Sequence, residues 1–282
     1  MTVPAGVPVT LSVRGLSFSA LSWGPADGRT VLLLHGFPQR STSWTAVAAR
    51  LAALGMHVVA VDQRGYSAGA RPQQVTAYAM PELVADTVAV IEALGGSVDL
   101  VGHDWGGVVG WQVAARHPLL VRTWTAVSTP NQLALNELLA GSAEERSRFD
   151  YILGFREAGR AEQALLADDG AGLRSIYGGV VAPERVDADV EFFRQPGVLT
   201  AALNWYRAMS ITDAQDLPRV EVPTSYIWGS EDPAFSRAAA MSTGAFVDAP
   251  YSFVALEGAS HWLPDEAPDS VADEVARRVT GA

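Results

Sequence analysis

Short apolar runs alternate with amphipathic segments along most of the chain. The first run ends at Gly36, and a brief apolar run of this kind is typical of a strand buried on both faces. Six such runs predict strands within residues 30–36, 57–65, 98–104, 121–130, 224–229 and 252–258.

Between these runs, apolar residues recur with the spacing of one helical face. One predicted helix begins near Ser41 and stops at Gly55, and another has Pro81 at its start and Gly95 at its end. Their apolar positions are Trp44, Val47, Leu51 and Leu54 in the first helix, and Val84, Val88, Ile91 and Leu94 in the second. Strands that alternate with helices predict an α/β fold, in which helices flank both faces of a mostly parallel sheet.

The alternation stops between residues 131 and 213, where the pattern becomes helical and charged. An insertion between two strands of such a sheet would lie above the carboxyl ends of the strands, where open α/β folds bind ligands. We therefore expect a core formed by residues 1–130 and 214–282. Residues 131–213 are expected to form a helical cap, or lid, inserted before the last two strands.

The segment LVGHDWGG (residues 100–107) carries the first chemical signal. A predicted strand runs into Gly-x-Asp-x-Gly and then into a helix, which is the layout of a nucleophile elbow. Serine is the usual central residue, whereas this chain has Asp104 between Gly102 and Gly106. A carboxylate, with a reference pKa of about 3.9, is ionised at neutral pH and needs no base to attack.

Two further reactive side chains follow predicted strands, Asp232 and His261. Because parallel strands end at the same edge of a sheet, both should lie near Asp104. An aspartate at a strand end often caps the next helix, and a single histidine is often only a satisfied polar residue. All three positions together, next to the elbow glycines, favour a catalytic triad of Asp104, Asp232 and His261.

The amino-acid composition excludes several classes of binding partner and of reaction. Acidic residues outnumber basic ones by 31 to 20, which gives a formal charge of −11 and argues against nucleic acid or an anionic membrane as a partner. All 20 basic residues are arginine, so lysine nucleophiles and Schiff bases are excluded. The absence of cysteine excludes disulfides and thiolate chemistry.

The chain also lacks the sequence marks of export and of a zinc helix. Its first residues have neither a basic start nor an apolar block, and no apolar run approaches the roughly 18 residues of a membrane span. We therefore expect a cytoplasmic protein. No two histidines have the i, i+4 spacing of a zinc-binding helix, so we expect no metal site.

Five segments of the core resemble the epoxide hydrolases of the α/β-hydrolase fold, in which nucleophile, acid and histidine follow in this chain order. They are HGFP (35–38), VDQRGYSAG (61–69), GHDWGG (102–107), WGSEDP (228–233) and GASHW (258–262). The resemblance reaches the predicted cap. FDYILGFREAG, with Tyr151, and LNWYR, with Tyr206, are similar to the segments that carry that family's two ring-opening tyrosines, and LNWYR is the more specific match.

The resemblance implies hydrolysis of an epoxide to a vicinal diol through an ester on Asp104. Tyr151 and Tyr206 would protonate the departing oxygen. His261, oriented by Asp232, would then activate water to hydrolyse the ester.

Further expectations concern the surroundings of the reaction. The backbone N–H groups of Phe37 and Trp105 would form the oxyanion hole. We expect Phe37, Trp105 and Trp205 to contact a small apolar epoxide. Water is the second substrate, no cofactor is required, and the protein is expected to be a monomer or a homodimer.

Two alternatives remain at this level. A haloalkane dehalogenase shares the fold and the aspartate elbow, but that family resembles this chain except for an asparagine after the His-Gly pair, where this chain has Phe37. A non-catalytic ligand-binding protein of the same fold could lose parts of the triad, and all three positions here are chemically competent. Paired tyrosines in the cap favour epoxide hydrolysis over dehalogenation, and the competent triad favours an enzyme over a non-catalytic protein.

Overall fold

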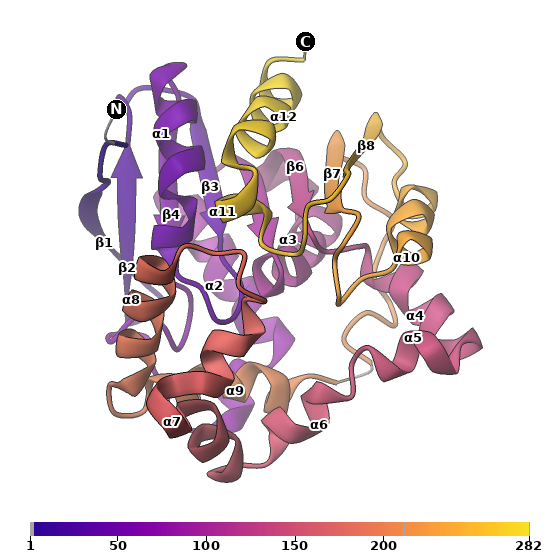
Figure 1. The fold of residues 1–282 in the computed structure, drawn as a ribbon. Helices are drawn as coiled ribbons and strands as arrows, with labels where there is room; N and C mark the ends of the chain where they lie inside the picture. Colours follow the sequence, from indigo (N-terminus) through magenta and orange to yellow (C-terminus); the bar gives the residue numbers. More distant parts are fainter. Residues whose placement is uncertain (1–2, 211, 282) are drawn as a thin grey trace.

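In residues 3–210 and 212–281, which the computed structural model describes, eight strands form one sheet with helices on both faces (Figure 1). Their order is β1-β2-β4-β3-β5-β6-β7-β8. β2 pairs antiparallel with both β1 and β4, and all other neighbours are parallel, which confirms the predicted mostly parallel sheet. The strands are β1 Val7–Val13, β2 Leu16–Trp23, β3 Thr30–Leu34, β4 His57–Val61, β5 Val98–His103, β6 Val121–Val127, β7 Thr224–Gly229 and β8 Tyr251–Leu256.

The side chains of β3 show how the sheet divides the core into two layers. Val31 and Leu33 pack on the face that α1 and α12 cover, whereas Leu32 and Leu34 pack on the face of α2 and α3. All four side chains are buried, because helices cover both faces of the sheet. The core helices are α1 Thr45–Ala53, α2 Met80–Ala93, α3 Trp105–Arg116, α10 Arg237–Ser242, α11 Leu263–Glu266 and α12 Pro268–Thr280, with short 3₁₀ segments η1 Ser41–Trp44, η2 Val75–Tyr78, η3 Pro118–Leu120 and η4 Thr243–Phe246.

The hairpin of β1 and β2 was not among the predicted strands. Both segments alternate apolar and polar residues, which is the pattern of strands with one exposed face. The turn between them consists of Arg14 and Gly15, both with positive φ (52° and 73°), as tight hairpin turns require. The missed signal was therefore this alternation around a short turn.

The first predicted helix is also shorter than expected. η1 precedes α1, which ends at Ala53, and Leu54 leaves the helix with 63% of its surface exposed. The backbone turns at Gly55, where φ is +85°. Because the turn rotates Leu54 away from the sheet, its predicted place on the buried face is wrong, whereas Trp44, Val47 and Leu51 are buried there.

Helices α4 to α9 follow one another between β6 and β7, so they precede the last two strands as predicted. Figure 1 shows α6 to α9 gathered at one end of the sheet. α9 packs closely against the core along its length, because eight of its 11 residues are buried. The bounds are α4 Gln132–Gly141, α5 Ala143–Ser147, α6 Tyr151–Arg156, α7 Arg160–Ile176, α8 Pro183–Arg194 and α9 Val198–Ala208.

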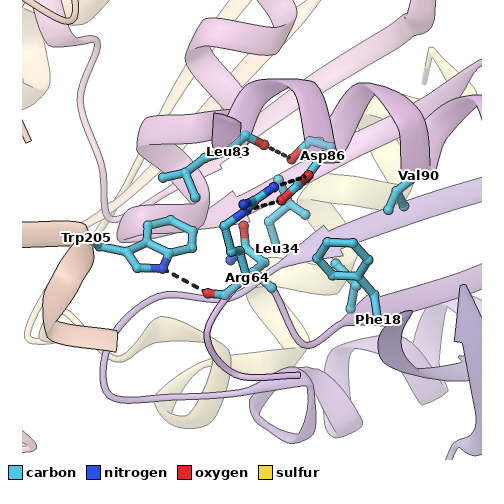
Figure 2. A pocket seen from close by; sticks show the side chains of 10 residues that line it. Phe18, Leu34, Arg64, Leu83, Asp86, Val90 and Trp205 are labelled. Atoms are coloured by element: carbon cyan, nitrogen blue, oxygen red, sulfur yellow. Dashed lines mark hydrogen bonds and ion pairs between the residues drawn. The ribbon is translucent and has the colours of Figure 1, made fainter. Parts of the chain in front are cut away.

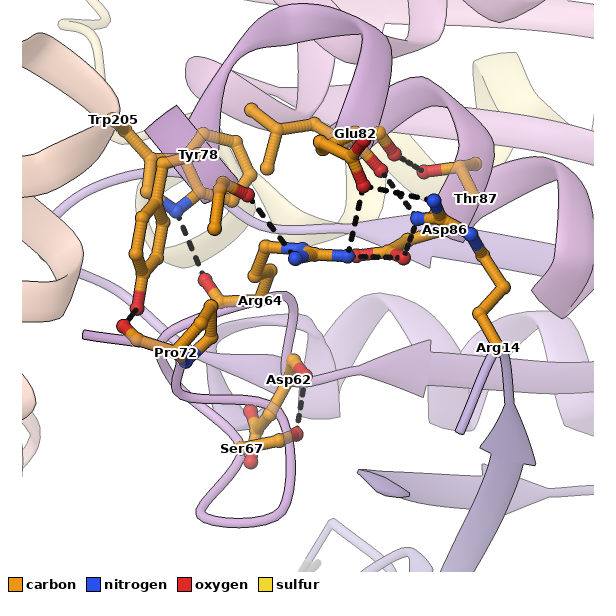
Figure 3. A network of polar contacts seen from close by, with 12 residues as sticks. Arg14, Asp62, Arg64, Ser67, Pro72, Tyr78, Glu82, Asp86, Thr87 and Trp205 are labelled. Carbon is orange, nitrogen blue, oxygen red and sulfur yellow. Dashed lines mark hydrogen bonds and ion pairs between the residues drawn. The ribbon is translucent and has the colours of Figure 1, made fainter. Parts of the chain in front are cut away.

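A buried ion pair joins the loop after β4 to α2 (Figure 3). The Arg64 guanidinium binds Asp86 through two parallel bonds, Nε to Oδ2 at 2.5 Å and Nη2 to Oδ1 at 2.7 Å. Both residues are buried, and Arg14 of the hairpin turn also donates to Asp86. Asp86 therefore connects three segments that are distant in sequence.

Replacing Asp86 with asparagine should destabilise the fold by about 3–5 kcal/mol, because buried Arg64 would lose its bidentate partner and keep only the longer contact of 3.7 Å to Glu82. Denaturant unfolding of the variant measures this loss. Glu82→Gln is the comparison on the same helix, since Glu82 is half-exposed, pairs mainly with Arg14 and should contribute about 1 kcal/mol or less. Equal losses in the two variants would contradict the role assigned to the buried pair.

Candidate active site

Asp104 occupies a strained turn between β5 and α3. Its φ of 51° and ψ of −120° are unusual for a residue with a side chain, and such strain persists only where the surrounding structure imposes it. Gly36 is required beside it, because a Cβ there would lie 2.2 Å from Asp104 Oδ1. Gly106 is required for a similar reason, since its Cβ would lie 2.2 Å from the carbonyl oxygen of Leu34. The turn therefore places the carboxylate at the carboxyl end of β5, where it lines a cavity.

The two oxygens of Asp104 face different partners. Oδ1 accepts a hydrogen bond from the backbone N–H of Phe37 at 2.8 Å, and Oδ2 lies 3.6 Å from His261 Nε2. Burial opposes ionisation, but the hydrogen bond and charge of His261 and the backbone N–H of Trp105 together hold the pKa of Asp104 below its ordinary value. The carboxylate is thus kept ionised although it is largely removed from water.

His261 lies between two carboxylates. Its Nδ1 is 2.9 Å from Asp232 Oδ2, which leaves Nε2 directed toward Asp104. Asp232 is fixed in turn, because its Oδ1 accepts hydrogen bonds from the backbone N–H groups of Ala234 at 2.8 Å and Phe235 at 3.1 Å. The structure therefore brings the three predicted triad residues together at the ends of β5, β7 and β8.

The electrostatic balance at His261 favours its protonated form. Burial acts to lower the pKa of His261, but the charges and hydrogen bonds of Asp232 and Asp104 outweigh it and raise the pKa to about 10. At neutral pH the imidazole is therefore a cation that stabilises Asp104.

Two other buried histidines support the site, and neither was assigned this role from the sequence. His103 Nε2 donates to the carbonyl oxygen of His261 at 2.8 Å, and burial lowers the pKa of His103 to about 3, so it is neutral. His35 donates through Nδ1 to the carbonyl of Gly36 at 3.0 Å and accepts at Nε2 from the backbone N–H of Gln63 at 3.1 Å. Both residues fix backbone next to the reacting side chains.

The two predicted tyrosines lie in the cap above Asp104. The ring of Tyr206, on α9, is buried and packs edge-on against Trp105 and Phe37, with centroids 5.1 and 5.6 Å apart. Tyr151, the first residue of α6, lies 6.4 Å from Tyr206 between ring centroids and is 43% exposed. Removal of the phenol groups from bulk water, and next the charge of Asp104, raise the pKa of both tyrosines, so both are neutral.

A cavity of about 660 Å³ opens between these tyrosines and Asp104. Asp104, Trp105, Tyr151 and Tyr206 line it, and Gln132, Leu135, Asn136 and Leu139 form its wall on one face of α4. Most of the remaining lining is apolar, including Met80, Val108, Phe149 and Phe235. Such a cavity can hold a small molecule against Asp104.

Trp205 lies behind the site rather than against this cavity. Figure 2 shows its indole beside the Arg64–Asp86 pair, where Nε1 donates to the carbonyl oxygen of Arg64 at 2.9 Å. The cavity at this place is only about 10 Å³, which is too small for a substrate. The ring of Trp205 also packs on Trp105, 5.5 Å between centroids, so Trp205 holds the turn of α9 that carries Tyr206. Its predicted contact with substrate stays a prediction.

Within residues 3–210 and 212–281, no group of three or more histidine, aspartate or glutamate side chains is arranged to hold a metal ion. Over the same ranges, no helix is long and apolar enough to cross a membrane.

Comparisons with known proteins extend this description. A family model described as the alpha/beta hydrolase family matches residues 31–274. Epoxide hydrolase A of Mycobacterium tuberculosis is 30% identical, with 96% of each chain covered. AB hydrolase superfamily protein YfhM of Bacillus subtilis is also 30% identical, with 92% of each chain covered.

Solved structures of epoxide hydrolases also superimpose on this chain. The crystal structure of epoxide hydrolase A from Mycobacterium thermoresistibile superimposes with a TM-score of 0.86 at 26% identity, with 98% of each chain covered. An epoxide hydrolase of Bacillus megaterium in complex with an inhibitor gives a TM-score of 0.87 at 26% identity, covering 96% of this chain and 100% of that one.

The pKa of His261 can be tested directly by following its ring signals by NMR as the pH is raised. We expect a midpoint near pH 10 in the substrate-free protein. Asp104→Asn removes one of the two carboxylates, so the midpoint should fall. Glu231→Gln, at an exposed position beside Asp232, should leave the midpoint unchanged. An unaltered midpoint in Asp104→Asn would refute the electrostatic coupling between the two residues.

Proposed function

Because the chain belongs to the α/β-hydrolase family and, within it, to the epoxide hydrolases, we propose that it hydrolyses epoxides to vicinal diols through an ester on Asp104. The observation that carries the proposal is an ionised carboxylate at the elbow, placed between a His–Asp pair and two cap tyrosines. An epoxide presents a saturated carbon whose leaving oxygen stays attached, and it therefore requires a nucleophile on one side and a proton donor on the other.

Ring opening uses the charge on Asp104. Oδ2 attacks one epoxide carbon, while Oδ1 remains bound to the N–H of Phe37. The carbon–oxygen bond of the ring breaks, and Tyr206 or Tyr151 transfers a proton to the departing oxygen. An alkoxide is far more basic than a phenolate, so this transfer is favourable even though the pKa of both phenols is raised.

Ester hydrolysis uses the His–Asp pair. Once Asp104 is an ester, His261 faces only one carboxylate and its proton affinity falls, so it gives its proton to the tyrosinate left by ring opening and becomes neutral. Neutral His261 then takes a proton from water, the resulting hydroxide attacks the carbonyl carbon of the ester, and the N–H groups of Phe37 and Trp105 stabilise the oxyanion. The acyl–oxygen bond breaks, and His261 gives the proton to the diol oxygen. The Asp104 carboxylic acid, which keeps an oxygen atom from water, returns its proton to His261 and restores the starting state.

The lining of the cavity supports a small, mainly apolar substrate. Trp105, Val108 and Phe235 surround the carboxylate with apolar surface, which favours an apolar substituent beside the epoxide ring. No step of this mechanism uses a cofactor.

Replacing Tyr206 or Tyr151 with phenylalanine removes a proposed proton donor and leaves the ring. Ring opening should slow by about 10²–10⁴-fold where the mutated residue is the sole donor, and less where the other tyrosine compensates. Single-turnover kinetics of ester formation measure this step apart from ester hydrolysis. Full rates in both single variants and in the double variant would refute the assignment.

A trapped intermediate distinguishes epoxide hydrolysis from haloalkane dehalogenation. His261→Gln keeps a polar side chain but removes the base, so the ester should accumulate. An epoxide adds without losing an atom, so the protein should gain the full mass of the substrate on a peptide that contains Asp104. A haloalkane would leave an adduct lighter by the hydrogen halide.

We expect full-mass adducts from a panel of small epoxides and none from the matching haloalkanes. Adducts from haloalkanes alone would refute the proposed reaction. An epoxide adduct on a residue other than Asp104 would refute the proposed nucleophile.

A further inference from the structure

The loop after β3 carries the Phe37 N–H that binds Asp104, and the cap contacts this loop from above. Tyr177, directly after α7, places its hydroxyl 3.0 Å from the carbonyl oxygen of Pro38. The same hydroxyl lies 2.8 Å from Oδ2 of Asp189 on α8. Both Tyr177 and Asp189 are 1% exposed, so water does not compete for these contacts.

The hydrogen bonds among Tyr177, Pro38 and Asp189 depend on one another, because a single tyrosine proton serves two acceptors. The Tyr177 hydroxyl has a single proton and two acceptors within hydrogen-bond distance, Pro38 O and Asp189 Oδ2. If Asp189 is protonated, it donates to the tyrosine oxygen, and the tyrosine proton is free for Pro38. If Asp189 is ionised, the two acceptors share one proton. A hydrogen-bond donor at the position of Asp189 Oδ2 therefore strengthens the hydrogen bond from the Tyr177 hydroxyl to the Pro38 carbonyl.

Several charged or titratable groups surround Asp189. Arg40, at the end of the same loop, donates through Nε to Oδ1 at 3.1 Å, and Arg185 of α8 contributes a second positive charge. Burial outweighs these groups and raises the pKa of Asp189 above its ordinary value. On the other side, Asp265 of α11 accepts from Gln39 Nε2 at 2.5 Å, and its negative charge lies close enough to interact with Asp189. Asp189 is thus held between the loop and the cap.

The ring of Tyr177 links the same contact to the triad. It packs on Trp262, the residue after His261, with centroids 4.9 Å apart. One cap residue therefore touches both the loop of the Phe37 donor and the segment of the catalytic histidine.

We propose that Tyr177 and Asp189 are positioning residues, which act from the cap to hold the Phe37 N–H as an oxyanion donor. This inference rests on the proposed function, because the donor matters when negative charge develops on the ester oxygen. Ring opening instead consumes the charge on Asp104, so a weaker hydrogen bond to Oδ1 should not slow that step. Weakening this contact should therefore lower the rate of ester hydrolysis and leave the rate of ester formation unchanged.

The test compares Tyr177→Phe with Tyr226→Phe. Tyr226, on β7, is equally buried, and its hydroxyl has no hydrogen-bond partner among the described residues, so its removal controls for loss of a buried hydroxyl. Removal of an entire oxyanion donor costs about 10²–10³-fold, so a displaced donor should slow ester hydrolysis by about tenfold. We expect this loss in Tyr177→Phe with an unchanged rate of ester formation, and no loss in Tyr226→Phe.

Asp189→Asn supplies the conservative variant. Its amide oxygen can accept from Arg40, and its Nδ2 can donate to the Tyr177 oxygen, which leaves the tyrosine proton for Pro38. Ester hydrolysis should therefore stay at the wild-type rate. A loss as large as that of Tyr177→Phe would overturn the assignment of this proton to Pro38.

A substrate-free measurement separates this inference from the proposed function. Hydrogen exchange in the peptide that spans residues 35–40 should be faster in Tyr177→Phe than in Tyr226→Phe. Equal exchange and equal ester hydrolysis in the two variants would overturn the inference, as would parallel losses in ester formation and hydrolysis. A wild-type protein that converts no epoxide would instead refute the proposed function.

Discussion

The contact between Asp104 and His261 is the interaction on which the rest of the site depends. A carboxylate withdrawn from water tends to take up a proton, and a protonated Asp104 could not act as a nucleophile. The imidazole 3.6 Å away and the N–H of Phe37 at 2.8 Å supply the stabilisation that water would otherwise give. The strained elbow, the close approach of Gly36 and the fixed orientation of Asp232 all serve to keep these groups within reach of one carboxylate.

The second requirement is a fixed position of the cap, because the proposed acids lie on α6 and α9 while the nucleophile and base lie on the core. Two buried polar contacts provide it. Trp205 donates to the carbonyl of Arg64 after β4, and Tyr177 reaches Pro38 after β3. A buried hydrogen bond of this kind is costly to leave unmade, so each contact restricts where its helix can lie. The Arg64–Asp86 pair holds the first of these loops against α2 (Figure 3).

The sequence predicted those parts of the structure that depend on local patterns. The buried runs around β3 to β7 were found because helices cover both faces of these strands. Asp104, Asp232 and His261 were found because each lies in the loop or turn that follows a strand. The hairpin of β1 and β2 escaped because its apolar residues alternate. The hydrogen bond of Tyr177 to Pro38 had no detectable signal, since the acceptor is a backbone carbonyl about 140 positions away in the chain. Likewise, no pattern in the sequence indicated that the indole N–H of Trp205 donates to the carbonyl oxygen of Arg64.

The charges in the site also explain how His261 can serve two opposite purposes in the proposed cycle. Before the reaction it must be a cation, because only the doubly protonated ring carries a hydrogen on Nε2, which faces Asp104, as well as on Nδ1, which faces Asp232. Afterwards it must be a neutral base. At 3.6 Å the attraction between the two charges is about 4–5 kcal/mol for an effective dielectric constant of about 20. Ester formation removes that attraction at the moment when a base is first needed. The nucleophile's own loss of charge therefore releases the proton of His261, and Asp232 retains the imidazole in place for the attack by water.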